Sequence, residues 1–93
     1  MAEEQRARTR SAWRPDDIVA YEEMRDLAIS VQSLLIARAR QDNGLAIGAR
    51  AEATQIRCDT LAIDGFDRKA VDARTRRLAL RLLELRAEER DRG

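Results

Sequence analysis

The side chains that could carry out chemistry in this chain are few. It contains no histidine, and its single cysteine is Cys58, so it cannot build an imidazole base or the usual serine or cysteine triad. Neighbouring carboxylates such as Glu22 and Glu23 leave a helix in different directions and do not converge on a substrate. The same residues offer no usual zinc set. The composition therefore predicts a protein that is not an enzyme and that uses no metal or cofactor.

Cys58 has two candidate roles. Because Arg57 precedes it, its thiolate could be stabilised, and the residue could then sense oxidation. A free cysteine is more often a small apolar side chain in a protein core. We expect the second role.

Arginine is the charged residue that the chain uses most. Only Lys69 among the 18 basic residues is a lysine, and 17 acidic residues leave a net charge of +1. A guanidinium group suits phosphate, but nucleic-acid-binding domains are usually strongly basic overall. Glu84 and Glu88 continue one arginine-rich flank with the opposite charge, which favours surface salt bridges or a complementary dimer seam. The candidate nucleic-acid contacts are Arg6, Arg8, Arg10, Arg68, Lys69, Arg74, Arg76, Arg77 and Arg81.

Periodicity divides the chain into an arm and one domain. Residues 1–14 are polar and show no periodicity, so we expect a flexible basic arm there. After Pro15 no further proline interrupts the sequence. Residues 15–93 are therefore predicted to form a single all-α domain.

Three helices are expected in this domain, because its apolar residues recur at spacings of three and four. Pro15 suits a first helical turn, and Asp67 can cap the start of the last helix. The middle segment is ambiguous, since residues 54–61 have the β-branched content of a strand. Its alanine-rich start favours a helix. The predicted helices cover about residues 15–40, 45–63 and 67–90.

The apolar stripes of these helices are wide for a chain of 93 residues. Ile29 and Ile36 widen the stripe of the first helix, and Leu80 and Leu83 broaden that of the last. The predicted helices also exceed the usual mean of about 11–12 residues, and a partner subunit would stabilise them. We therefore expect a hairpin-like three-helix bundle that forms a homodimer or a higher oligomer. The residues expected at its interface are Met24, Leu27, Val31, Leu34, Leu78, Leu82 and Leu85.

Two functions are compatible with this architecture. The first is a small helical adaptor or regulator, which contacts itself and another protein through helices. The alternative is a DNA-binding regulator or DNA-packaging factor, because residues 60–77 have the spacing of a helix-turn-helix. In that arrangement the basic arm and the start of the last helix would contact the duplex. An ordinary helical hairpin has the same spacing, so we favour the adaptor.

The segment Gly65–Val71 is locally similar to a stretch of the GapR-like nucleoid-associated proteins, where a glycine, an aromatic residue and an aspartate precede a basic helix. The similarity covers about seven of 93 residues and implies a DNA-associated role. The coiled-coil pattern that comes before this stretch in that family is not evident here, and Asp72 stands where the family tends to be basic. No residue role is transferred from the similarity.

The sequence shows no pattern that is typical of secretion or of membrane insertion. No apolar run approaches the roughly 20 residues of a membrane-spanning helix, and residues 1–6 lack the hydrophobic stretch of a signal peptide. A single cysteine cannot form an internal disulfide. These features predict a cytoplasmic protein with no membrane partner.

Overall fold

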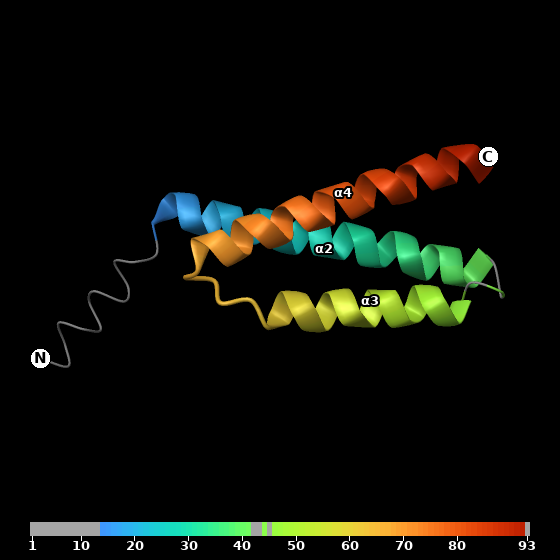
Figure 1. Cartoon of the computed structure of the whole chain (residues 1–93), viewed down its shortest axis with the longest axis horizontal. Coiled ribbons are helices and arrows are strands. Elements are labelled where there is room, and N and C mark those ends of the chain that lie inside the picture. The colour runs from blue at the N-terminus through green and yellow to red at the C-terminus, as the bar shows by residue number, and fades with distance from the viewer. Residues whose placement is uncertain (1–13, 42–43, 45, 93) are drawn as a thin grey trace, which may run out of the picture.

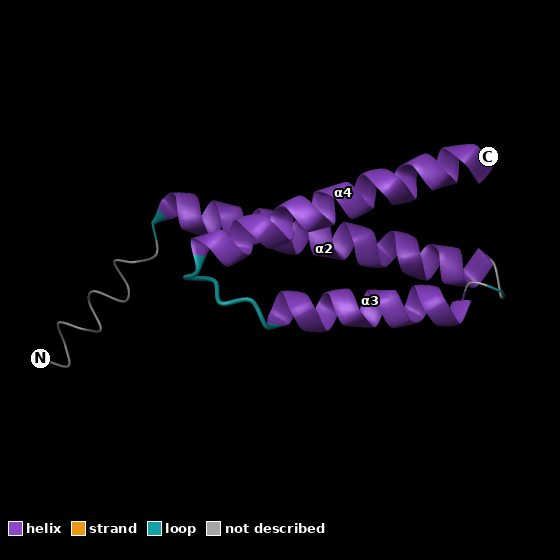
Figure 2. Cartoon of the chain, viewed as in Figure 1, coloured by secondary structure: helices purple, strands orange, loops and turns teal. Residues whose placement is uncertain are grey.

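The computed structural model consists of three α-helices in succession (Figure 1, Figure 2). It describes residues 14–41, 44 and 46–92, and within these ranges no residue is in a strand. The helices are α2 (Pro15–Gln41), α3 (Ala46–Leu61) and α4 (Arg68–Arg92). The all-α prediction is confirmed, and the ambiguous middle segment is a helix. The predicted arm, apart from Arg14, lies outside the described residues.

Local interactions explain where the helices begin. Pro15 occupies the first position of α2, and the carbonyl of Arg14 accepts a hydrogen bond from the Asp17 amide at 2.9 Å. At the start of α4, the Asp67 side chain accepts one from the Ala70 amide at 3.1 Å. This is the capping geometry predicted for Asp67, and it satisfies an amide that has no partner within the helix.

Helix α2 is the central element of the fold. It packs closely against both α3 and α4, whereas no comparable packing of backbones joins α3 to α4. In Figure 1, α3 runs back along α2, and α4 then runs in the same direction as α2. Residues 62–67 join α3 to α4. The segment 60–77 therefore lacks the compact unit of a helix-turn-helix, in which a turn of three or four residues joins two packed helices.

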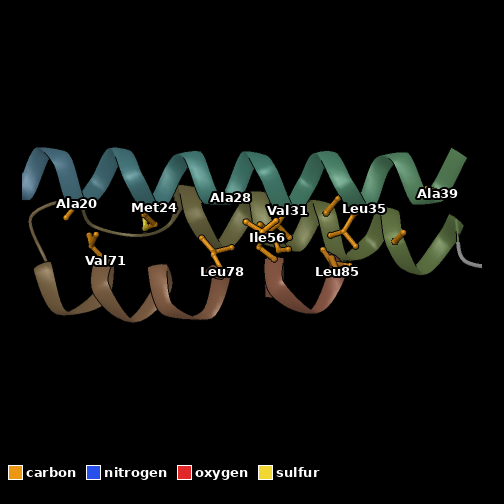
Figure 3. Packing of buried hydrophobic residues seen from close by; sticks show 13 residues of the cluster. Ala20, Met24, Ala28, Val31, Leu35, Ala39, Ile56, Val71, Leu78 and Leu85 are labelled. Carbon is orange, nitrogen blue, oxygen red and sulfur yellow. The ribbon is translucent and has the colours of Figure 1, made fainter. Parts of the chain in front are cut away.

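Each helix contributes one stripe of side chains to a common core (Figure 3). The stripe of α2 has spacings of three and four residues, so that it faces both partner helices. Five of the residues expected at an oligomer interface are buried in this core, and Leu27 and Leu34 are half-buried against it. The buried apolar residues are Ala20, Met24, Ala28, Val31, Leu35, Ala39, Ala49, Ala53, Ile56, Val71, Leu78, Leu82 and Leu85.

Other apolar residues are exposed, which corrects two expectations. Leu80 and Leu83 do not broaden the core stripe of α4, because they are 63% and 62% exposed. They lie on the face opposite Leu78 and Leu82, since α4 packs closely against α2 alone. Cys58 is exposed as well, so the prediction that it fills the core was wrong.

Candidate interaction surfaces

Arg38 lies inside the fold although it is charged. Its side chain is only 10% exposed and reaches from α2 to α4. There it donates hydrogen bonds to the Glu88 carboxylate and to the Leu85 carbonyl, at 2.5 and 3.5 Å. Toward its C-terminal end α4 diverges from α2 in Figure 1. The long arginine side chain therefore bridges the two helices where they move apart.

Two further arginines join α4 to α3. Arg74 is mostly buried and donates a hydrogen bond to the Ile56 carbonyl at 3.3 Å. Arg81 donates two hydrogen bonds to the Glu52 carboxylate, at 2.6 and 2.9 Å. Because the carboxylate stabilises the charged guanidinium, the pKa of Arg81 is raised above its ordinary value. Side chains thus link two helices whose backbones do not pack together.

The candidate nucleic-acid contacts fall into three groups. The first group makes intramolecular ion pairs and consists of Arg68, Arg74 and Arg81. Arg68 donates hydrogen bonds to the carboxylates of Asp72 and Asp17 at 2.9 and 2.8 Å, and these bonds raise the pKa of Arg68. Lys69, Arg76 and Arg77 are exposed, and none of them forms an ion pair within the described part of the chain. Arg6, Arg8 and Arg10 lie outside the described residues.

A groove between α2 and α3 forms the first candidate surface. It holds a hollow of about 240 Å³ lined by Arg25, Ala28, Ile29, Gln32, Arg57, Thr60 and Leu61. Ile29 and Leu61 are exposed, and the Thr60 hydroxyl is buried and has no hydrogen-bond partner among the described residues. The groove therefore combines an apolar surface with two guanidinium groups.

The outer face of α4 forms the second candidate surface. Seven residues follow one another there at alternating spacings of four and three, with Leu80 and Leu83 at the centre. We call this line the outer seam. Its residues are Lys69, Ala73, Arg76, Leu80, Leu83, Ala87 and Arg90. Ala87 is half-buried and the other six are exposed.

The described residues show no sign of a metal centre or of a membrane span. They contain no group of three or more histidine, cysteine, aspartate or glutamate residues placed to hold a metal ion. None of the helices α2, α3 and α4 is both long enough and apolar enough to cross a membrane. The chain matches no protein-family model, no curated protein and no solved structure. The arrangement of its side chains is thus the basis for a functional proposal.

Neither candidate surface was identified as such from the sequence. The outer seam could have been recognised, because its alternating spacing is visible in the sequence as a second stripe beside the core stripe. The groove could not, since Ile29 and Leu61 come from different helices and meet only in the folded chain.

Proposed function

We propose that this protein is a small non-enzymatic adaptor or regulator, which associates with itself and binds another protein through its helices. The supporting observation is that nine large hydrophobic side chains in the described residues are exposed although the core is already formed. Removing such side chains from water contributes about 25 cal/mol per Å² of apolar surface to a complex, and this contribution is offset in part by the freedom that the two partners lose. Exposed apolar side chains mark an interaction site where they lie together, as Ile29 and Leu61 do in the groove and Leu80 and Leu83 do on the outer seam.

The groove between α2 and α3 suits an acidic amphipathic helix of another protein. An apolar side chain of that helix would pack against Ile29 and Leu61. Its carboxylates would meet Arg25 and Arg57, neither of which forms an ion pair within the described residues. Apolar contacts would supply most of the affinity, and the charges would select the partner.

Sedimentation velocity over a wide concentration range tests the self-association. We expect a species of at least twice the 10.6 kDa mass of the chain. A monomer at every concentration would contradict this part of the proposal. For the groove, the proteins that the wild type captures from a cell lysate would be compared with those that an Ile29→Glu, Leu61→Glu variant captures. Equal capture by both chains would exclude the groove.

Binding to DNA is the second candidate function. Its support is the exposed cluster of Lys69, Arg76 and Arg77 on α4, together with the arginines of residues 1–14. Within the described residues Lys69, Arg76 and Arg77 form no ion pair, so they could meet phosphates, which supply most of the non-specific affinity for a duplex. The near-neutral net charge of +1 and the salt-bridged state of Arg68, Arg74 and Arg81 favour the adaptor.

A further inference from the structure

We propose that the outer seam of α4 binds the outer seam of a second copy of this chain, with the two α4 helices antiparallel. This inference rests on the self-association proposed above and specifies its surface, its orientation and the charges that align it.

The spacing of the outer seam is the first argument. The apolar residues of the outer seam, Ala73, Leu80, Leu83 and Ala87, occupy a and d positions of successive heptads, which is the pattern that keeps one stripe in contact as two helices supercoil. The core stripe of α4 lies on the opposite face, where Leu78 and Leu85 are buried. A second copy can therefore cover the outer seam without disturbing the core.

The order of residues along the outer seam determines the orientation. In a parallel pair each residue of the seam would lie opposite its own copy, so that Arg76 would face the partner's Arg76. In an antiparallel pair centred between Leu80 and Leu83, Leu80 packs against the partner's Leu83. Arg76 then faces the partner's Ala87. The antiparallel arrangement thus pairs the leucines and keeps like charges apart, which lowers the electrostatic cost of association.

The residues beside the outer seam supply complementary charges. Arg77 and Glu84 occupy the same flanking position in successive heptads. Glu84 has only one ion pair in the described part of the chain, a 3.6 Å contact with Arg81. Equivalent flanking positions face each other across an antiparallel pair, so Arg77 would meet the partner's Glu84. Because the dimer has two-fold symmetry, this pairing would occur twice.

A charge exchange tests the arrangement by sedimentation equilibrium. We expect Arg77→Glu and Glu84→Arg each to raise the dissociation constant about tenfold or more. The double variant should return to near the wild-type value, because each pair is re-formed with its charges reversed. Arg50→Glu on α3 and Glu23→Arg on α2 are matched exposed controls and should leave association unchanged. Circular dichroism would verify that every variant is folded.

A thiol experiment tests the orientation separately, in a Cys58→Ser background. Ala73→Cys places the two introduced thiols about 25 Å apart in an antiparallel pair, so no disulfide should form between copies. Mixed Arg76→Cys and Ala87→Cys chains should cross-link to each other. A disulfide between two Ala73→Cys chains would indicate a parallel pair and overturn the proposal.

The outcomes separate this inference from the proposed function. A wild type that is monomeric at all concentrations would remove this inference and the self-association on which it rests, but not the proposed binding of another protein through the groove. If the wild type associates and a folded Leu80→Glu, Leu83→Glu variant associates equally well, the outer seam is excluded while self-association stands. Loss of association in that variant, with rescue in the charge exchange, would establish the antiparallel seam.

Discussion

Arg81 of α4 holds Glu52 of α3 through two hydrogen bonds, from Nε to Oε2 at 2.6 Å and from Nη2 to Oε1 at 2.9 Å. This two-pronged geometry is the strong form of an arginine–carboxylate pair, because both donors are aligned by the planar guanidinium group. It joins two helices that pack closely on α2 but not on each other. Together with Arg74, this side-chain pair links α4 to α3.

Breaking this pair should weaken the fold measurably. We expect Arg81→Ala and Glu52→Ala to show a coupling free energy of about 1 kcal/mol in a double-mutant cycle of urea unfolding. The pKa of Arg81 is raised in the folded state, so its contribution is complete below the unfolded pKa and is lost only as the pH rises through the folded one. The coupling should therefore be constant between pH 6 and pH 9. A coupling near zero would show that the pair does not position α4.

The buried Arg38 leads to a different prediction. Arg38 has two carboxylate partners, which a Glu88→Ala, Glu89→Ala variant removes. Its side chain, 10% exposed, then keeps only the Leu85 carbonyl as a partner among the described residues. We expect the free energy of unfolding to fall by about 3 kcal/mol. Arg38→Met, which keeps the volume and removes the charge, should cost much less. Thermal unfolding followed by circular dichroism would show which of the two variants is less stable. If the Glu88→Ala, Glu89→Ala variant were as stable as Arg38→Met, the prediction would be wrong.

Substitutions in the core and on the surface should differ sharply. Leu85 is fully buried, and Leu85→Ala should lower the free energy of unfolding by about 2–5 kcal/mol. Leu82→Asp places a charge among the core side chains and should unfold the chain. Ile47 is 85% exposed, so Ile47→Ala should change stability by no more than about 0.5 kcal/mol. If urea titrations showed that Leu85→Ala and Ile47→Ala change the free energy of unfolding equally, Leu85 would not be part of the core.

The sequence predicted what depends on local interactions. Apolar periodicity identified the three helices, and the Asp67 cap could be predicted because it bonds an amide only three residues away. Periodicity shows which residues share a face, but it does not show which face is covered. Leu80 and Leu83 were for this reason predicted to broaden the main stripe of the last helix, although they are exposed on another face of α4.

The buried arginines could not be predicted for a related reason. Arg38 is next to Glu88 only in the folded chain, because the two residues are 50 positions apart in the sequence. Likewise, Arg74 reaches the carbonyl of Ile56 on another helix. A charged residue is usually on the surface, and nothing in its immediate neighbours indicates that a distant partner will satisfy it.

The structure also determines how DNA binding should be tested. Charge reversal at Arg74 would disturb its contact with Ile56, so a loss of affinity in such a variant would not report on phosphates alone. Arg76→Glu with Arg77→Glu changes two exposed side chains that have no ion pair in the described residues. If the chain is an adaptor, fluorescence anisotropy at about 0.15 M salt should show that neither the wild type nor this double variant binds duplex DNA.

If the chain instead binds DNA, its affinity should fall steeply as salt rises, and losing two phosphate contacts should reduce the log–log slope by about 1.8. Lys69→Glu with Arg76→Glu provides a second double variant, which keeps the Arg77 charge. Because Arg77 flanks the outer seam and Lys69 and Arg76 belong to it, the self-association of both double variants would be measured beside their DNA affinity. A log–log slope that is reduced in both double variants would assign the exposed basic face of α4 to phosphate. Affinity that neither double variant alters would place the contacts away from this face.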